Sequence, residues 1–258
     1  MSRNPGPWPE GTPAWVDLMV PDRRQAQDFY GGLFGWEFTE GGPGTGSYAI
    51  CRKDGEAVAG IGELVAETAV PASTWTTYLA VDDADGTASR IRAAGGAVGS
   101  GPNTISGGRV AVARDPGGAH FGIWESGSHT GAAIVDEPST MCGHEVLTRD
   151  FAAVRTFYTS VFDYHASDLS DADWTYCSLE CNGVTVGGIG ELPAEVPTEI
   201  AAHWMTYFAS ADTDAAARRA EELGGQILNE PTDAAFGRLA VLQGPAGEVF
   251  AVVTRPGQ

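Results

Sequence analysis

The chain has 258 residues, of which 43% are hydrophobic and 19% charged, a composition that supports packed cores and argues against a disordered chain. It has 15 Lys and Arg against 34 Asp and Glu, which gives a formal net charge of −19. Because phosphate binding needs clustered basic side chains, this balance argues against a nucleic-acid partner, and it equally disfavours an anionic membrane surface.

The segment of residues 1–13 is polar and rich in Pro and Gly, and no apolar run in the chain approaches the length of a membrane-spanning helix. We expect this segment to be a flexible tail. The four cysteines, at positions 51, 142, 177 and 181, show no CxxC spacing. Free thiols in a reducing compartment are therefore expected, and with them a cytoplasmic location.

An internal repeat runs through most of the chain. Phe29-Tyr30 recurs as Phe157-Tyr158, an offset of 128, and the pentapeptide GIGEL at 60–64 recurs at 188–192. One inserted residue then moves the offset to 129, where Gly108-Arg109 matches Gly237-Arg238. Such dense self-similarity predicts two modules, 14–126 and 140–255, joined by an irregular linker over 127–139.

Both copies begin with an alternating strand, and an Asp then stands where a helix N-cap belongs. After the helix, two short strands are joined by Asp-Gly in the first copy and Asn-Gly in the second, which is typical of tight hairpins. The predicted strands of this half are 15–20, 48–52 and 57–61 in the first copy and 144–148, 176–180 and 185–189 in the second.

The second half of each copy repeats the theme, with a strand, a helix closed by paired glycines and a final hairpin. Its predicted strands are 76–81, 109–114 and 119–124, then 205–209, 238–243 and 249–253. We therefore predict an α+β fold of two tandem βαβββ modules with curved mixed sheets forming a cleft, related by a pseudo-twofold axis. Neither module should be stable alone, because one face of its sheet needs a partner.

The segments WVDLMVPDRRQAQDFYGGLFGWEF and GGAVGSGPNTISGGRVAVARDPGGAHFGIW, with their second copies, resemble the vicinal oxygen chelate superfamily of glyoxalases, bleomycin-resistance proteins and extradiol dioxygenases. The likeness is closest to two-module actinobacterial members labelled as hydroxylases or antigens, some of them from aromatic polyketide pathways. It covers roughly residues 14–255. The resemblance implies the fold and leaves the reaction open, since the superfamily includes isomerases, dioxygenases, epimerases and drug-binding proteins.

Active members of this superfamily hold a metal through a His or Gln in the first strand and a Glu in the last strand of each module. A one-residue shift of the alignment would offer His144 and Glu125, but such a shift turns a side chain to the opposite face of the sheet. We therefore expect neither a metal nor another cofactor. The matching positions, none of which carries a metal-binding atom, are Trp15, Gly122, Gly143 and Ala251.

Asp17 and Glu145 occupy matching positions in the two first strands, two residues after the expected ligand positions. Alternate residues of a strand share a face, so both are expected in the cleft, where two carboxyl groups could act as acid and base. The alternative that we favour is a structural ion pair of each with Arg109 or Arg238. His144 is a further acid/base candidate, although a lone His is more often a structural residue.

Tyr and Trp side chains are frequent in the strands that should line the cleft. Together they would stack on a flat ligand while the Tyr hydroxyl groups orient it, although some of them must pack in the core. Arg109 and Arg238 could clamp an anionic group of the ligand, but a salt bridge at the sheet edge is the simpler interpretation. The predicted aromatic ligand-binding residues are Trp15, Tyr48, Trp75, Tyr78, Trp124, Tyr176, Trp204 and Tyr207.

Two functions remain open from the sequence. The first, which we favour, is metal-independent binding of a flat hydrophobic small molecule, for sequestration, delivery or resistance in secondary metabolism. The second is a cofactorless, hydroxylase-like tailoring enzyme that acts on an aromatic metabolite through Asp17, Glu145 or His144. Carboxyl groups paired with arginine would favour binding, whereas an unpaired carboxyl group with a raised pKa would favour catalysis. The sequence leaves open the ligand and whether two chains form a homodimer.

Overall fold

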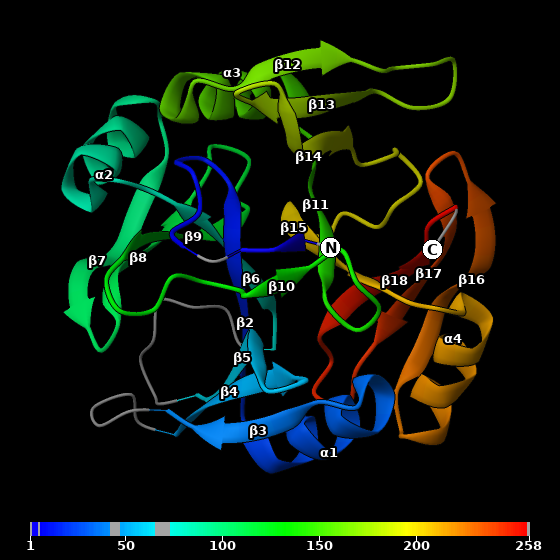
Figure 1. Cartoon of the computed structure of the whole chain (residues 1–258). Coiled ribbons are helices and arrows are strands. Elements are labelled where there is room, and N and C mark those ends of the chain that lie inside the picture. The colour runs from blue at the N-terminus through cyan, green and yellow to red at the C-terminus, as the bar shows by residue number, and fades with distance from the viewer. Residues whose placement is uncertain (1, 5, 42–46, 65–72, 257–258) are drawn as a thin grey trace.

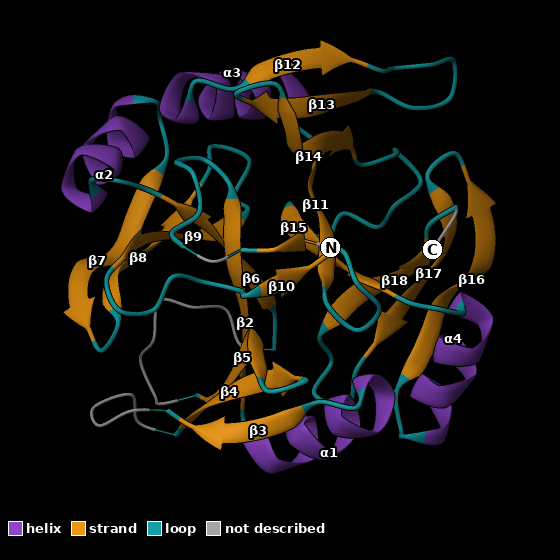
Figure 2. Cartoon of the chain, viewed as in Figure 1, coloured by secondary structure: helices purple, strands orange, loops and turns teal. Residues whose placement is uncertain are grey.

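The structure, a computed structural model, describes residues 2–4, 6–41, 47–64 and 73–256. Over these ranges the chain forms two eight-stranded sheets and four helices. A two-stranded sheet joins β1 (Ser2–Arg3) to β10 (Ile134–Val135), which lies between the modules in sequence. The helices lie on the outside of the molecule and the central strands run through its middle (Figures 1 and 2).

The first sheet has the strand order β3-β4-β5-β2-β6-β9-β8-β7. Its two central strands, β2 and β6, are antiparallel, whereas β2 with β5 and β6 with β9 are parallel pairs. The elements are β2 (Pro13–Val20), α1 (Arg23–Phe34), β3 (Glu37–Glu40), β4 (Tyr48–Lys53), β5 (Glu56–Glu63), β6 (Trp75–Ala80), α2 (Ala84–Ala93), β7 (Ala97–Ile105), β8 (Gly108–Arg114) and β9 (His120–Ser126).

The second sheet repeats this arrangement in the order β12-β13-β14-β11-β15-β18-β17-β16. The two equivalent mixed sheets confirm the predicted fold class. Each module comprises two consecutive βαβββ units that share one sheet, where the prediction named a single unit per module. The edge strands β3, β7, β12 and β16 were not predicted. The elements are β11 (Met141–Thr148), α3 (Phe151–Phe162), β12 (His165–Asp168), β13 (Tyr176–Cys181), β14 (Val184–Glu191), β15 (His203–Ala209), α4 (Thr213–Glu222), β16 (Gln226–Ala234), β17 (Gly237–Gln243) and β18 (Val249–Thr254).

Local sequence accounts for how these elements begin and turn. Asp22 caps helix α1 by accepting a hydrogen bond from the backbone N–H of Gln25 at 3.0 Å. The β4–β5 hairpin turns at Asp54-Gly55 and the β13–β14 hairpin at Asn182-Gly183, and all four residues have the positive φ that a type I′ turn requires.

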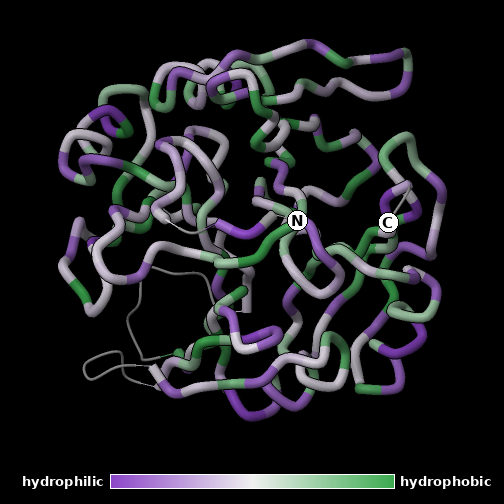
Figure 3. The backbone as a smooth tube through the Cα atoms, in the orientation of Figure 1, coloured by the Kyte–Doolittle hydropathy of each residue, from purple (hydrophilic) through white to green (hydrophobic). Residues whose placement is uncertain are grey.

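The two hydrophobic cores each combine residues from both modules. In the first core, Phe29 of α1 packs against Phe250 of β18, with ring centroids 6.4 Å apart. In the second core, Phe121 of β9 packs against Phe157 of α3 at 6.0 Å. Helix α1 consequently lies beside α4 and helix α2 beside α3 (Figure 1). Hydrophilic residues recur along these outer helices, and hydrophobic stretches run through the strands inside (Figure 3).

A buried hydrogen-bonded triad of Trp, Tyr and a carboxyl group ties the modules together in the first core. Trp75 Nε1 donates to the Tyr30 hydroxyl at 2.9 Å, and that hydroxyl donates to Glu248 of the second module at 2.9 Å. Glu248 also accepts from the backbone N–H of Ala246 at 3.0 Å. The carboxyl group of one module therefore satisfies a tyrosine of the other.

The second core has the matching triad with the modules exchanged. Trp204 Nε1 donates to the Tyr158 hydroxyl at 2.8 Å, and that hydroxyl donates to Asp115 of the first module at 3.1 Å. Asp115 stands at the start of the β8–β9 turn, whereas Glu248 stands at the end of the β17–β18 turn. The same contact is thus made from opposite ends of two equivalent turns.

The segment before β2 makes several contacts with the rest of the chain. Ser2 and Arg3 pair with β10, Trp8 Nε1 donates to the Ala132 carbonyl at 3.1 Å, and the Gly11 N–H donates to Ala80 at 2.9 Å. A detached tail would lack such contacts, although residues 1 and 5 of the expected tail lie outside the described residues. None of the four described helices has the length and apolar character needed to cross a membrane.

Candidate functional site

The central strands of each sheet have two different faces. In the first sheet, Val16 and Leu18 pack in the core with helix α1, so Asp17 between them points to the other side. Thr76 lies directly opposite Asp17 on strand β6 and shares its face. We call the side that carries Asp17 the first inner face, and the corresponding side of the second sheet, which carries Glu145, the second inner face.

The modules meet through the opposite, core-facing sides of these strands. Thr77 Oγ1 lies 3.1 Å from His144 Nδ1 and 3.5 Å from Thr206 Oγ1, and all three side chains are buried. Each inner face therefore belongs to a separate sheet and points away from this interface. Asp17 and Glu145 do not meet, and the acid/base pair considered from the sequence is not formed.

His144 belongs to the interface between the modules and not to an inner face. It follows the alternation of strand β11, so it points away from Glu145. Burial and, to a smaller extent, the charge of Arg255 lower the pKa of His144 to about 3, so the imidazole is neutral at ordinary pH. This placement gives no support to a role for His144 in acid/base chemistry.

On the first inner face, two tyrosines lie across glycines and reach towards Asp17. The Tyr48 hydroxyl donates to Asp17 Oδ2 at 3.3 Å. A Cβ at Gly60 would lie 1.8 Å from the Tyr48 oxygen, and a Cβ at Gly122 would lie 2.0 Å from the Tyr78 ring. Because glycine has no side chain, both rings can pack directly on the sheet.

Asp17 is a buried carboxyl group without an ion-pair partner among the described residues. Only 7% of it is exposed, and its pKa is raised to about 7, because the effect of burial outweighs the hydrogen bonds from Tyr78 and Tyr48, which lower it. Its Oδ1 atom and the Oγ1 atom of Thr76 are both buried without a hydrogen-bond partner. The first inner face is thus a closed and polar environment.

The linker between the modules covers the first inner face. The His129 ring packs edge-on against Trp15, with centroids 4.5 Å apart, and lies 5.6 Å from the Trp124 ring. Trp124 Nε1 donates to the His129 carbonyl at 3.0 Å, and the His129 N–H donates to the Gly107 carbonyl at 3.0 Å. Both tryptophans are consequently almost fully buried.

The second inner face has the same carboxyl–tyrosine theme in a more open setting. The Tyr207 hydroxyl donates to Glu145 Oε1. Tyr176 lies across Gly188, where a Cβ would stand 1.9 Å from its hydroxyl oxygen. Trp174 packs beside Tyr176, with ring centroids 4.5 Å apart and planes inclined by 31°. These three aromatic side chains are partly exposed, which makes them accessible to a ligand.

Glu145 is 9% exposed, and burial raises its pKa while the hydrogen bond from Tyr207 opposes that rise. It forms no ion pair within the described part of the chain. The residue opposite Glu145 is Met205, where the first module has Thr76. At this position the second inner face is therefore apolar where the first is polar.

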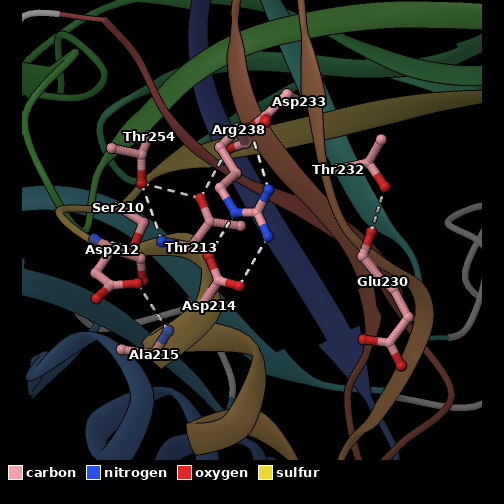
Figure 4. A network of polar contacts seen from close by, with 10 residues as sticks. All are labelled: Ser210, Asp212, Thr213, Asp214, Ala215, Glu230, Thr232, Asp233, Arg238 and Thr254. Atoms are coloured by element: carbon pink, nitrogen blue, oxygen red, sulfur yellow. Dashed lines mark hydrogen bonds and ion pairs between the residues drawn. The ribbon is translucent and has the colours of Figure 1, made fainter.

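Both candidate arginines are engaged at the sheet edges. Arg109 contacts Asp85 at 2.9 Å and Glu125 at 3.3 Å. Arg238 contacts Asp214 at 2.9 Å and Asp233 at 3.1 Å (Figure 4). The expected ion pairs of these arginines with the inner-face carboxyl groups are therefore wrong, because acidic residues at the starts of α2 and α4 lie nearer.

Glu125, the alternative metal ligand considered from the sequence, also binds the backbone N–H of Ala84 at the start of helix α2, at 2.8 Å. This contact lies on the outer side of the sheet. A one-residue shift of the alignment would require Glu125 on the inner face. The observed register, which pairs Arg109 with Glu125, places it on the outer side instead.

The predicted aromatic set divides between inner faces and cores. Trp75 and Trp204 belong to the core triads, so the structure does not bring them to a ligand. The sequence analysis did not assign Thr76, His129 and Phe236 to the inner faces. The only signal in the sequence was at the 129-residue offset, where Gly107 of the first module corresponds to Phe236 of the second. The inner faces hold Trp15, Tyr48, Tyr78 and Trp124 on the first and Tyr176 and Tyr207, with Trp174, on the second.

The donor atoms on the inner faces do not fit the superfamily's metal. At the first of two ligand positions, Trp15 offers only an indole N–H, which donates to Tyr48 at 3.0 Å. At the second, Gly122 offers only its backbone, which the Tyr78 ring covers. No group of three or more His, Cys, Asp or Glu side chains that could hold a metal ion occurs in the described ranges. One carboxyl group with phenols on each face is too few for a site that usually needs three protein ligands.

Two shallow hollows elsewhere on the surface carry no comparable chemistry. One, of about 360 Å³, lies between helix α1 and Leu223, and the other, of about 510 Å³, lies beside helix α3 and strand β12. Neither contains a buried unpaired carboxyl group. The inner faces are therefore the candidate functional sites, and the second is the accessible one.

Comparison with known families agrees with this architecture. The family model of the Glyoxalase/Bleomycin resistance protein/Dioxygenase superfamily matches residues 12–123 and 133–252. The chain belongs to this superfamily. These matched ranges lie close to the modules expected at 14–126 and 140–255.

Related proteins come from actinobacteria. The anthracycline biosynthesis protein DnrV of Streptomyces peucetius is 38% identical over 258 residues, covering 94% of this chain and 93% of its own. CFP32 of Mycobacterium tuberculosis, whose name places it among glyoxylases, is 38% identical over 252 residues, covering 95% of each chain. The anthracycline biosynthesis protein DauV of Streptomyces sp. strain C5 is 36% identical, covering 94% of this chain and 93% of its own.

Solved structures share the fold at low sequence identity. The Mn(II)-bound glyoxalase from Novosphingobium aromaticivorans superposes with a TM-score of 0.67 at 18% identity, covering 95% of this chain and 82% of its own. The 2,2',3-trihydroxybiphenyl 1,2-dioxygenase of Sphingomonas wittichii RW1 gives 0.65 at 15%, covering 95% and 91%. These similarities establish the fold and carry no reaction with them.

Proposed function

We propose that this superfamily member binds a flat, largely apolar aromatic metabolite on the second inner face and transforms it by acid–base catalysis without a resident metal. The observation that carries the proposal is Glu145, a buried carboxyl group with a raised pKa and, within the described structure, no arginine partner, next to accessible aromatic rings. Unpaired carboxyl groups in the described structure favour catalysis over the binding function that the sequence analysis preferred.

The residues of the second inner face have complementary roles in this mechanism. The Glu145 carboxylate accepts a proton from the bound metabolite, either from a phenol or from a carbon next to a carbonyl group. The pKa of Tyr207 is raised by burial, by the charge of Glu145 and by its hydrogen bond to Glu145. Its hydroxyl therefore stays protonated and can donate a hydrogen bond to the negative charge that develops on the metabolite. Trp174 and Tyr176 offer their rings for stacking on the metabolite.

The relatives support an aromatic metabolite as the substrate class. Two of them are named for anthracycline biosynthesis, and anthracyclines are built on a flat polycyclic ring system. This likeness supports a role in secondary metabolism, and we propose a small molecule, not a nucleic acid or a membrane, as the partner. The four free cysteines support a cytoplasmic location.

Metal independence is part of the same proposal. Its support is the set of residues at the superfamily's ligand positions, which lack donor atoms, and the Tyr78 ring that lies across Gly122. The carboxyl and phenol groups of this chain would then carry the proton transfers.

A second candidate is binding without turnover, and one observation favours it. Tyr207 already hydrogen-bonds Glu145, so the carboxyl group could serve only to fix the tyrosine that orients a ligand. Sequestration, delivery or resistance would then be the function. The aromatic rings have the same role in both cases.

Proton exchange on a model compound separates the two candidates. The probe is 1,8-dihydroxyanthrone, whose ring CH2 group is acidic; its hydrogen–deuterium exchange in D2O is followed by NMR, and binding is followed by tryptophan fluorescence. Glu145→Gln should slow catalysed exchange by a hundredfold or more while affinity changes by less than about tenfold, or about 1.4 kcal/mol. Asp17→Asn, the matched change on the first inner face, should leave exchange within about threefold. Fluorescence binding without acceleration of exchange by wild type over buffer would leave binding alone as the function, and acceleration that persists in Glu145→Gln would contradict the role of Glu145 as the base.

A further inference from the structure

The two modules differ at the tip of the hairpin before the repeated Gly-Arg pair. In the first module the turn between β7 and β8 is Ser106-Gly107, and in the second module the turn between β16 and β17 is Ala235-Phe236. Glycine in one copy thus corresponds to phenylalanine in the other. Both turns reach the mouth of their inner face, because Gly107 contacts His129 and Phe236 contacts Tyr207.

We propose that Phe236 is a specificity-determining wall of the second inner face, and that the linker residue His129 fills the matching place in the first. The chain then takes one flat aromatic ligand, on the second inner face only. This inference rests on the proposed small-molecule function and names the face and the residue that select the ligand.

Phe236 has the geometry of a ligand contact. Its ring lies 6.2 Å from the ring of Tyr207 at an interplanar angle of 83°, and 49% of the residue is exposed. A turn residue with half of its aromatic surface in water gains little from folding, but a flat molecule placed over Tyr207 would cover that surface. The ring thus extends the accessible aromatic surface of Tyr207.

The backbone holds Phe236 in this position. Gly237, the next residue, has φ 140°, and a Cβ there would lie 2.3 Å from the Thr254 carbonyl oxygen. The turn therefore packs closely on strand β18, which requires glycine at 237. A wall that is fixed before binding loses little conformational entropy when the ligand arrives.

The first module excludes a comparable wall. A Cβ at Gly107 would lie 2.8 Å from the His129 Cβ, so a larger residue there cannot coexist with the linker in its observed place. The Gly107 carbonyl instead accepts hydrogen bonds from the Gly127 and His129 N–H groups at 2.9 and 3.0 Å. His129 then packs against Trp15 and closes the face to a ring system.

The residues opposite the two inner-face carboxyl groups agree with this division of roles. Thr76 in the first face has an unpartnered Oγ1 atom, whereas Met205 in the second is apolar and adaptable in shape. Both side chains are nearly covered, so they set the polarity of the sheet beneath each face: polar in the first and apolar in the second. Only the second face therefore matches an aromatic metabolite.

Calorimetric titration with 1,8-dihydroxyanthraquinone tests both parts. Wild type should bind about one molecule per chain. Phe236→Ala should weaken binding by about tenfold and Phe236→Leu by less, because leucine keeps apolar area but not the ring. Val184→Ala removes another exposed apolar side chain of the same module, 65% exposed, and should change affinity by less than about twofold.

Two results would overturn the inference while the proposed function stands: equal affinity in Phe236→Ala and wild type, or two equivalent molecules bound per chain. Failure of wild type to bind the anthraquinone would contradict both the inference and the proposed function. The exposed position of Phe236 means that its variants should fold, which circular dichroism verifies.

Discussion

Between the two modules, the cores keep the same Trp–Tyr–carboxyl triad, while the inner faces have only a carboxyl group and two tyrosines in common. The first inner face is covered by His129 and retains the polar Thr76, and the second has Met205 and the exposed Phe236. The contacts that join the modules are shared in full, whereas the inner faces share only a tyrosine–carboxyl hydrogen bond and a tyrosine that lies across a glycine. Residues that hold the two halves together have therefore stayed equivalent, and residues that could meet a ligand have diverged.

Burial of Asp17 on the first inner face should make the stability of the chain depend on pH. Asp17 has a pKa of about 7 in the folded chain against an ordinary value of 3.8, so the folded state holds an extra proton between these values. The free energy of unfolding should therefore fall as pH rises from about 4 to about 7, by at most about 4 kcal/mol. Asp17→Asn should match wild type near pH 4 and be more stable at pH 8.

Urea unfolding of both proteins at pH 4, 6 and 8 measures this difference. Asp115, Glu145 and Glu248 also have raised pKa values, but their contributions cancel between the two proteins. A stability difference that is constant across this range would show that Asp17 titrates normally.

The equivalence of the cores predicts matched losses from two substitutions. Tyr30→Phe removes the hydrogen-bond partner of Trp75 Nε1 and of Glu248 Oε1, and Tyr158→Phe does the same to Trp204 Nε1 and Asp115 Oδ2. Each should lower the free energy of unfolding by about 2–4 kcal/mol, because two buried polar atoms lose their partner. Urea midpoints that differ greatly between the two variants would break the symmetry inferred here.

The linker contact should have a smaller effect, confined to one module. His129→Ala removes the ring that packs on Trp15 and Trp124 and should destabilise the chain by about 1–2 kcal/mol. Phe236→Ala, at the corresponding mouth, should change stability by less than about 0.5 kcal/mol because the ring is half exposed. Thermal unfolding of the two variants provides the test, and a larger loss in Phe236→Ala would reverse the roles assigned to the two mouths.

Removal of metal should have the smallest effect on either face. We expect treatment with EDTA to leave the unfolding midpoint unchanged, and elemental analysis of purified protein to find well below one Zn, Fe or Mn per chain. About one tightly held ion per chain, lost on His144→Ala, would contradict this expectation.

The repeat made much of the fold predictable, because a fixed offset aligned strand with strand and placed Asp17 and Glu145 on equivalent faces. The edge strands escaped prediction since their sequences, such as AVGSGPNTI in β7, are polar and interrupted by Gly and Pro. Contact partners were the least predictable. Asp85 and Asp214 reach the two arginines across helix starts, and His144 meets Thr77 across the modules, and neither neighbourhood follows from sequence spacing.

Each core combines residues of both modules, and this arrangement affects the order in which the two cores can fold. One core draws its residues from a continuous stretch between Leu79 and Trp204, whereas the other joins β2 and α1 to β15–β18 near the opposite end of the chain. During synthesis the continuous core can form first, whereas α1 can pack in its core only after β15–β18 have been synthesised. Closing that long loop is the slow, entropically costly step. A circular permutant with new ends in the 127–139 linker would make the waiting core the continuous one and reverse the order.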